Sequence, residues 1–139
     1  MSATQNVIKF GKGNGKVWDV TLTVGTAATT ATCTSTDYFA GRVIKVELDP
    51  GTLAGNFTIK GYEANTPLAT GTRDHFLDYT VATAVELVMY PVRNATVQNT
   101  GAAVTTARST EFIVCDRLRL DLAAAVAADV LRVRVYIEE

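Results

Sequence analysis

The chain has 139 residues, a formal net charge of −1 and a pI near 5.8. This length fits a single domain that buries its core without disulfides or metal ions, and the near-neutral charge excludes a broad attraction to nucleic acid or anionic lipid. Charged residues are only 19% of the sequence, and threonine is abundant. Threonine favours strands, because its β-branched side chain fits a pleated surface. We therefore expect one domain over residues 1–139, with neither nucleic acid nor membrane as a partner.

Apolar and polar side chains alternate with a period of two along the first half of the chain. This period is typical of strands that pack on one face and meet solvent on the other. The glycine-rich segment 11–15 predicts a hairpin, and Trp18 is expected to anchor the core. The Pro50-Gly51 turn most simply predicts an antiparallel pair on either side of it, while 26–36 fits either a flat strand or a long loop. The predicted strands are 7–10, 16–24, 42–49 and 56–62.

The second half of the chain repeats this pattern, with mixed character at 73–79 and a polar segment at 93–106 expected at an exposed tip. About eight strands at roughly ten-residue spacing, without alternating helices, indicate a sandwich or a barrel. The predicted fold is an all-β, single-domain antiparallel β-sandwich. Its remaining predicted strands are 84–90, 111–115, 116–122 and 129–138.

Candidate chemistry is sparse along this sequence. His75 is the single histidine, and its neighbour Asp74 would point to the opposite face of an extended segment, which does not suit a catalytic dyad. Cys33 and Cys115 are too far apart to suggest a zinc site, and Cys115 in its apolar run is expected to be a buried, reduced thiol. The glycine-rich segment lacks the ending of a phosphate-binding loop. We expect no enzyme, no cofactor and no metal, although a carboxylate site assembled by the fold stays open.

Arginines alternate along two segments near the end of the chain. If these two strands pair, their outer faces form a basic stripe suited to an acidic partner or a neighbouring subunit. The alternative is a solvated face balanced by Asp116, Asp121, Glu138 and Glu139. The candidate subunit or capsid contacts are Arg117, Arg119, Arg132, Arg134 and Tyr136.

Three stretches carry a resemblance to a known group of proteins. They are RVIKVELDPGTLAGNFTI at 42–59, YPVRNA at 90–95 with NTGAA at 99–103, and LRVRVYI at 131–137. In layout and short phrases the chain resembles the small Thr/Ala-rich β-proteins encoded among the virion genes of tailed bacteriophages. The resemblance covers most of the chain from about Gly41 onward, and it includes no catalytic signature.

This resemblance implies a head decoration, or cement, protein with a jelly-roll-like sandwich. Such a protein is made in the host cytoplasm, binds the major capsid protein on the outer capsid surface, often as a homotrimer, and stabilises the assembled head. Residues 1–6 would then form a flexible N-terminal arm. Two alternatives stay open. One is a tail, baseplate or head-fibre component, and the other is a carbohydrate-binding module, for which Tyr62 and Tyr136 on the predicted solvent faces join Tyr38, Tyr79 and Tyr90 as candidates.

Overall fold

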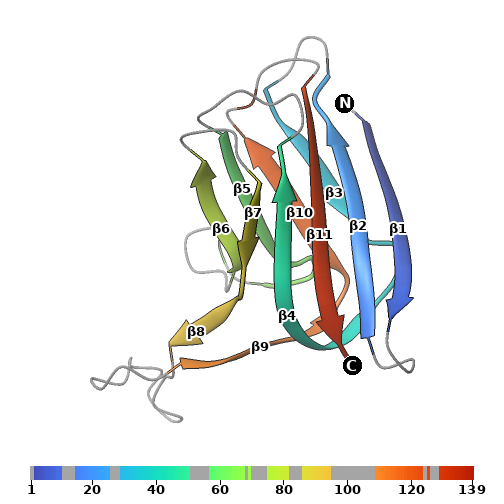
Figure 1. Ribbon diagram of the computed structural model, residues 1–139, viewed down its shortest axis with the longest axis vertical. Helices are drawn as coiled ribbons and strands as arrows, with labels where there is room; N and C mark the ends of the chain where they lie inside the picture. Colours follow the sequence, from blue (N-terminus) through green and yellow to red (C-terminus); the bar gives the residue numbers. More distant parts are fainter. Residues whose placement is uncertain are drawn as a thin grey trace.

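The computed structural model describes residues 2–10, 15–25, 29–50, 57–67, 69, 75–81, 86–94, 109–123, 125 and 129–139. Over these residues the chain is a β-sandwich of two antiparallel sheets, as predicted, and contains strands without a helix (Figure 1). Within this part of the chain there is accordingly no helix that could cross a membrane. The sequence pattern underestimated the number of strands, because several are only three or four residues long.

The larger sheet has the strand order β1-β2-β11-β4-β9-β8, and β7 also pairs with β4. Along one edge the long strand β4 pairs with two strands in turn. Phe39–Val43 pair with β9, and Val46–Leu48 pair with β7. The strands of this sheet are β1 (Ser2–Phe10), β2 (Gly15–Thr23), β4 (Phe39–Asp49), β7 (Leu87–Met89), β8 (Val92–Asn94), β9 (Ser109–Asp116) and β11 (Val130–Glu138).

The smaller sheet has the order β3-β10-β5-β6 and packs against the larger one. The ambiguous segment 26–36 contains β3, and the mixed segment 73–79 contributes most of β6. The strands of this sheet are β3 (Ala31–Thr34), β5 (Phe57–Glu63), β6 (His75–Val81) and β10 (Leu118–Ala123).

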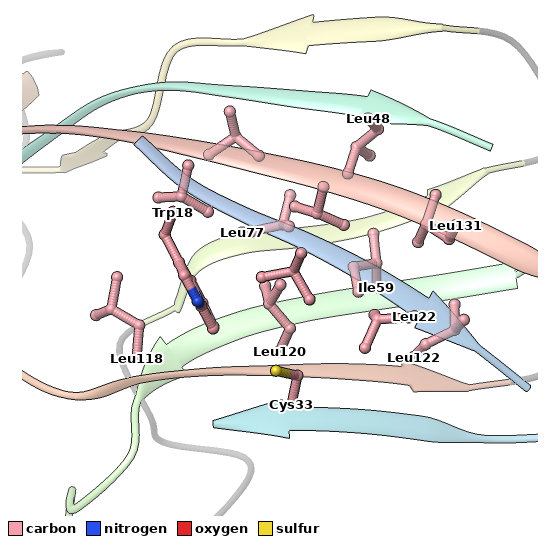
Figure 2. Packing of buried hydrophobic residues seen from close by; sticks show 14 of the residues in the cluster. Trp18, Leu22, Cys33, Leu48, Ile59, Leu77, Leu118, Leu120, Leu122 and Leu131 are labelled. Atoms are coloured by element: carbon pink, nitrogen blue, oxygen red, sulfur yellow. The ribbon is translucent and has the colours of Figure 1, made fainter. Parts of the chain in front are cut away.

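The hydrophobic core lies between the two sheets. Its largest member, Trp18, is fully buried as predicted. The centre of its ring lies 6.3 Å from the centre of the Phe39 ring. Leu22 and Leu131 from the larger sheet meet Ile59 and other residues of the smaller one (Figure 2). Because each strand sends alternate side chains inward, the period of two becomes a continuous apolar layer.

Three expectations about connectivity are wrong. The strands on either side of Pro50 do not pair, because β4 and β5 belong to different sheets. The two arginine-bearing strands do not pair either, since β10 lies in the smaller sheet and β11 in the larger. Residues 2–6 are not an arm, because they form the first part of β1 and pair with β2 from Ser2 opposite Thr23 onward. The predicted hairpin between these two strands is confirmed, while its loop lies outside the described residues.

A β-bulge changes the alternation expected in β4. The pairing of β4 with β11 shifts between Tyr136 and Ile137, which face Lys45 and Val43 and leave Ile44 as the extra residue. Val43 is therefore buried at 2% exposure, whereas Ile44, which strict alternation with the buried Val46 and Leu48 would place in the core, is only half-buried. A bulge of this kind places two consecutive residues opposite one and reverses the faces beyond it.

Candidate functional site

The outer face of the larger sheet carries a cross-strand network of charged side chains. These side chains point outward because their neighbours in β2, β4 and β11 fill the core. The pairing places Asp19 opposite Arg134, which in turn lies opposite Glu47. We call this surface the charged face and define it by Asp19, Lys45, Glu47, Arg132, Arg134 and Tyr136.

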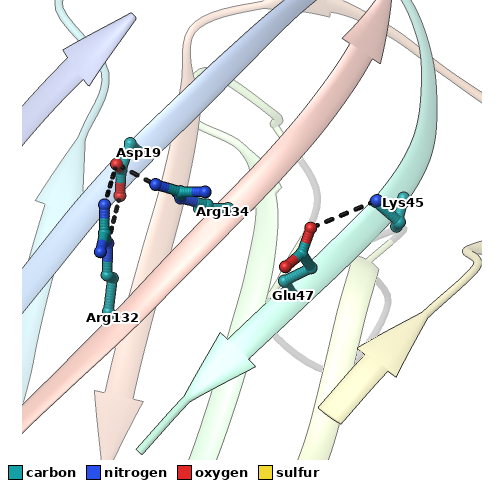
Figure 3. Close-up of polar contacts among 5 residues, drawn as sticks. All are labelled: Asp19, Lys45, Glu47, Arg132 and Arg134. Atoms are coloured by element: carbon teal, nitrogen blue, oxygen red, sulfur yellow. Dashed lines mark hydrogen bonds and ion pairs between the residues drawn. The ribbon is translucent and has the colours of Figure 1, made fainter. Parts of the chain in front are cut away.

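Asp19 is the centre of one half of the charged face. Arg132 donates two hydrogen bonds to its carboxylate, from Nε to Oδ1 at 3.0 Å and from a terminal nitrogen to Oδ2 at 2.7 Å. Nε of Arg134 lies 3.4 Å from the same Oδ2, and both guanidinium groups turn toward Asp19 in Figure 3. The hydrogen bond from Arg132 is the main cause that lowers the pKa of Asp19. A bidentate pair of this kind holds the Arg132 side chain in a fixed position.

The other half of the charged face is built on Glu47, Lys45 and Tyr136. Lys45 Nζ lies 3.2 Å from Oε1 of Glu47 (Figure 3). The same nitrogen lies 4.2 Å from the centre of the Tyr136 ring. A hydrogen bond between the Tyr136 hydroxyl and Glu47 lowers the pKa of Glu47 and raises that of Tyr136. Positive and negative groups therefore alternate across the strands, and most of their charge is neutralised within the face.

Exposed apolar side chains border this network. Val88 on β7 lies opposite Glu47 and is 53% exposed, and Ile113 on β9 lies opposite Arg42 and is 58% exposed. A shallow depression of about 190 Å³ separates Val88 from the arginines of β11. Its lining includes Glu47, Asp49, Glu86, Val88, Arg132 and Arg134. Mixed apolar, aromatic and arginine surfaces are typical of protein–protein contact areas.

The five predicted contact residues lie in three places. Arg132, Arg134 and Tyr136 are together on the charged face. Arg119 lies on the smaller sheet, where its Nε is 2.8 Å from Oδ1 of Asp121. Arg117 follows β9, and one of its terminal nitrogens donates to the Tyr38 hydroxyl at 3.0 Å. The single basic stripe does not form, because the two sheets separate its members.

The expected charge balance is correct for one pair and wrong for others. Asp121 balances one of the four arginines, since it forms an ion pair with Arg119. Glu138 and Glu139 instead pair with Arg42 and Lys16, at 2.8 and 3.1 Å. The partner of both β11 arginines is Asp19, which lies 113 residues before Arg132. Sequence reasoning missed Asp19 and Glu47 because their role depends on which strands are neighbours, and their only signal was an outward position in an alternating strand.

The cysteines and tyrosines are placed differently from expectation. Cys115 is exposed, and Cys33 is the buried thiol, whose pKa is raised by that burial; both are free. Tyr62 is only 3% exposed, since its ring packs edge-on against His75 at 5.5 Å and its hydroxyl donates to Asp121. This burial removes Tyr62 from the aromatic candidates for glycan binding. Asp74, the sequence neighbour of His75, lies outside the described residues.

Neither a search for metal ligands nor a comparison with known proteins adds a second candidate site to the charged face. Among the residues that the structure describes, no three His, Cys, Asp or Glu side chains gather closely enough to hold a metal ion. No protein-family model matches the chain, and no curated protein matches it.

Proposed function

We propose that the chain is a non-enzymatic virion structural protein of the decoration, or cement, type. In this proposal it binds the outer surface of an assembled bacteriophage capsid as a homo-oligomer and contacts the major capsid protein through the charged face. The observation that carries the proposal is this face itself, a wide sheet surface with a neutralised charge network and exposed Val88 and Ile113 at its side.

The order of the strands supports a jelly roll. In the larger sheet β2-β11-β4-β7 are neighbours, and β3-β10-β5-β6 form the smaller sheet. Two interlocked Greek keys would produce this order, and that arrangement is found in viral capsid and lectin domains. It agrees with the resemblance to virion proteins but does not by itself define a function, because one fold serves many roles.

The charge network also supports contact with a folded surface. Two hydrogen bonds to Asp19 hold Arg132, and Arg134 lies 3.4 Å from the same carboxylate, so Arg132 loses little side-chain freedom when a partner binds. The outer edges of the two guanidinium groups and the ring of Tyr136 belong to arginine and tyrosine. Both of these residue types are enriched in protein–protein contact areas. A partner with its own mixed charges would meet alternating signs, which favours one orientation over others.

The mechanism of such a protein is thermodynamic linkage. A ligand that binds the assembled lattice but not its separated subunits stabilises the lattice by mass action. At a free concentration one hundred times the dissociation constant, each site contributes about 2.7 kcal/mol. No bond is made or broken, and the stabilisation grows with the number of occupied sites.

Co-sedimentation with expanded capsids of the parent phage tests this proposal. The capsids are prepared without their outer proteins, and the purified chain is added in increasing amounts. We expect saturation at a fixed ratio of chain to major capsid protein and a higher melting temperature of the shells. A chain that stays in the supernatant at all concentrations would refute the decoration role.

Two matched variants locate the contact. Val88→Asp adds a carboxylate beside the charged face, and Ala123→Asp adds one at an exposed position of the smaller sheet. We expect Val88→Asp to weaken capsid binding and Ala123→Asp to leave it unchanged. Equal binding of both variants would show that the charged face is not the contact.

A further inference from the structure

Strand β1 forms a long free edge of the larger sheet. It pairs with β2 over nine consecutive positions without a bulge, and no described strand lies on its other side (Figure 1). From Ser2 to Ile8 it contains neither proline nor a charged residue. Such an edge presents a row of backbone donors and acceptors and is a template for another strand.

The other edges in the described part of the molecule carry features that discourage pairing. β3 has four residues, and β7 and β8 have three each. β6 is interrupted by a bulge opposite Gly61 and Tyr62 and carries the exposed Asp78. Short strands, bulges and charges are the devices by which proteins protect sheet edges. β1 is the described edge strand that is long and without a bulge, and its one charged residue, Lys9, lies next to its end.

The side chain of Gln5 holds β1 in place. Its Oε1 accepts from Trp18 Nε1 and from the backbone N–H of Thr36, both at 3.1 Å, and its Nε2 donates to the Thr34 carbonyl at 3.0 Å. An open depression of about 290 Å³ lies between Gln5–Val7 and Thr36–Asp37. The edge is therefore fixed before any partner arrives, and the surface beside its middle residues is open.

We propose that the free edge of β1 pairs antiparallel with β1 of a second copy, so that the larger sheets of two protomers become one. An antiparallel pair of identical strands is related by a two-fold axis. Each copy therefore donates and accepts backbone hydrogen bonds with the same residues that the other copy uses. With full overlap of Ser2–Phe10, Asn6 faces Asn6 of the other copy and Lys9 faces Ala3. This register opposes no like charges.

This pairing gives a dimer, in place of the trimer that the resemblance to decoration proteins implies. It also places the charged faces of both copies on the same side of one continuous sheet, because residues directly opposite in antiparallel strands share a face. The inference is independent of the proposed function, since self-association is measured with no capsid present.

Sedimentation velocity over a concentration series tests the pairing. For the unaltered chain we expect a reversible dimer of twice 14.9 kDa. Asn6→Lys places two like charges directly opposite and is expected to weaken the dimer about fivefold. Thr23→Lys, which adds the same charge to the outer face of β2, is the control and keeps the wild-type affinity. Mixing Asn6→Lys with Asn6→Asp should restore association through opposite charges.

Hydrogen exchange provides a second measurement. In β1 alternate backbone amides point away from β2, and we expect these amides to be protected at concentrations that favour the dimer and to exchange quickly on dilution. A monomer at high concentration, a trimer, or a dimer that Asn6→Lys leaves intact would each overturn the proposal. So would exchange of the outward amides that does not change with concentration.

Discussion

Replacing Gln5 with methionine tests how a single polar side chain closes the sandwich beside β1. Methionine keeps the length of glutamine but removes all three hydrogen bonds. The bonds to Thr34 and Thr36 are exposed, so water replaces them at little cost. Trp18 is fully buried, and its Nε1 loses the Gln5 acceptor. A buried donor left without a partner costs about 1–3 kcal/mol, which is the loss of stability that we expect for Gln5→Met.

A double-mutant cycle with Trp18→Phe isolates this interaction. Phenylalanine has no indole N–H, so Gln5→Met should cost about 1–3 kcal/mol less in the Trp18→Phe background than in the wild type. Urea unfolding followed by far-ultraviolet circular dichroism measures all four proteins in the same way. Gln5→Glu, which keeps an acceptor for the indole, serves as the control and should lose less stability than Gln5→Met. Strictly additive effects of the two substitutions would refute the reasoning.

Three further predictions concern the backbone, the thiols and the charged face. Gly41→Ala should lower stability in urea by about 1–3 kcal/mol, because its new Cβ would overlap the backbone carbonyl of Glu138. A thiol reagent should label Cys115 in the native protein and reach Cys33 only in denaturant, as counted by mass spectrometry. The pKa of Asp19 is lowered below its ordinary value of 3.8, so its stabilising effect is present above that pH and is lost as the pH falls through the lowered pKa. Asp19→Asn should therefore flatten the acid-unfolding curve in this range.

Each of these predictions has a matched control. Ala40→Ser changes an exposed neighbour of Gly41 and should leave the urea midpoint unchanged. Asp37→Asn alters an exposed carboxylate outside the charged face. Its acid-unfolding curve should be as steep as that of the wild type. Equal stability of Gly41→Ala and wild type, or labelling of both thiols in the native state, would contradict the geometry. An acid-unfolding curve of Asp19→Asn that overlays the wild-type curve would contradict the stabilising role of Asp19 in the charged face.

The class of fold follows from the sequence because alternation is a local property. Each strand carries its own period of two, and the apolar members of β2 and β11 are buried as that period predicts. The bulge at Ile44 is an exception, since an extra residue in one strand is defined by its partner and leaves no mark in the pattern. The same limit explains why Tyr62, at an outward position, is covered by residues from other strands.

The sequence did not predict which charged side chains of the site contact one another, because this depends on which strands are neighbours in the sheet. Outward arginines at 132 and 134 are visible in the alternation, but their partner Asp19 is brought to them by the pairing of β2 with β11. Arg119 has the same local pattern and belongs to the opposite sheet. Pairing between distant strands depends on the global topology, so a local pattern predicts which side chains face outward and not which of them meet.

The central position of β11 has a consequence for how the protein folds. β11 lies between β2 and β4, so these two strands cannot complete their sheet until residues 130–138 have left the ribosome. Until then the space between β2 and β4 in the sheet is empty. The contacts that close the sheet join β11 to β2 across more than one hundred positions and to β4 across more than eighty. Proteins dominated by such distant contacts fold slowly and expose unpaired strands while they do so. During synthesis, the waiting edges of β2 and β4 are therefore where a chaperone would be expected to act first.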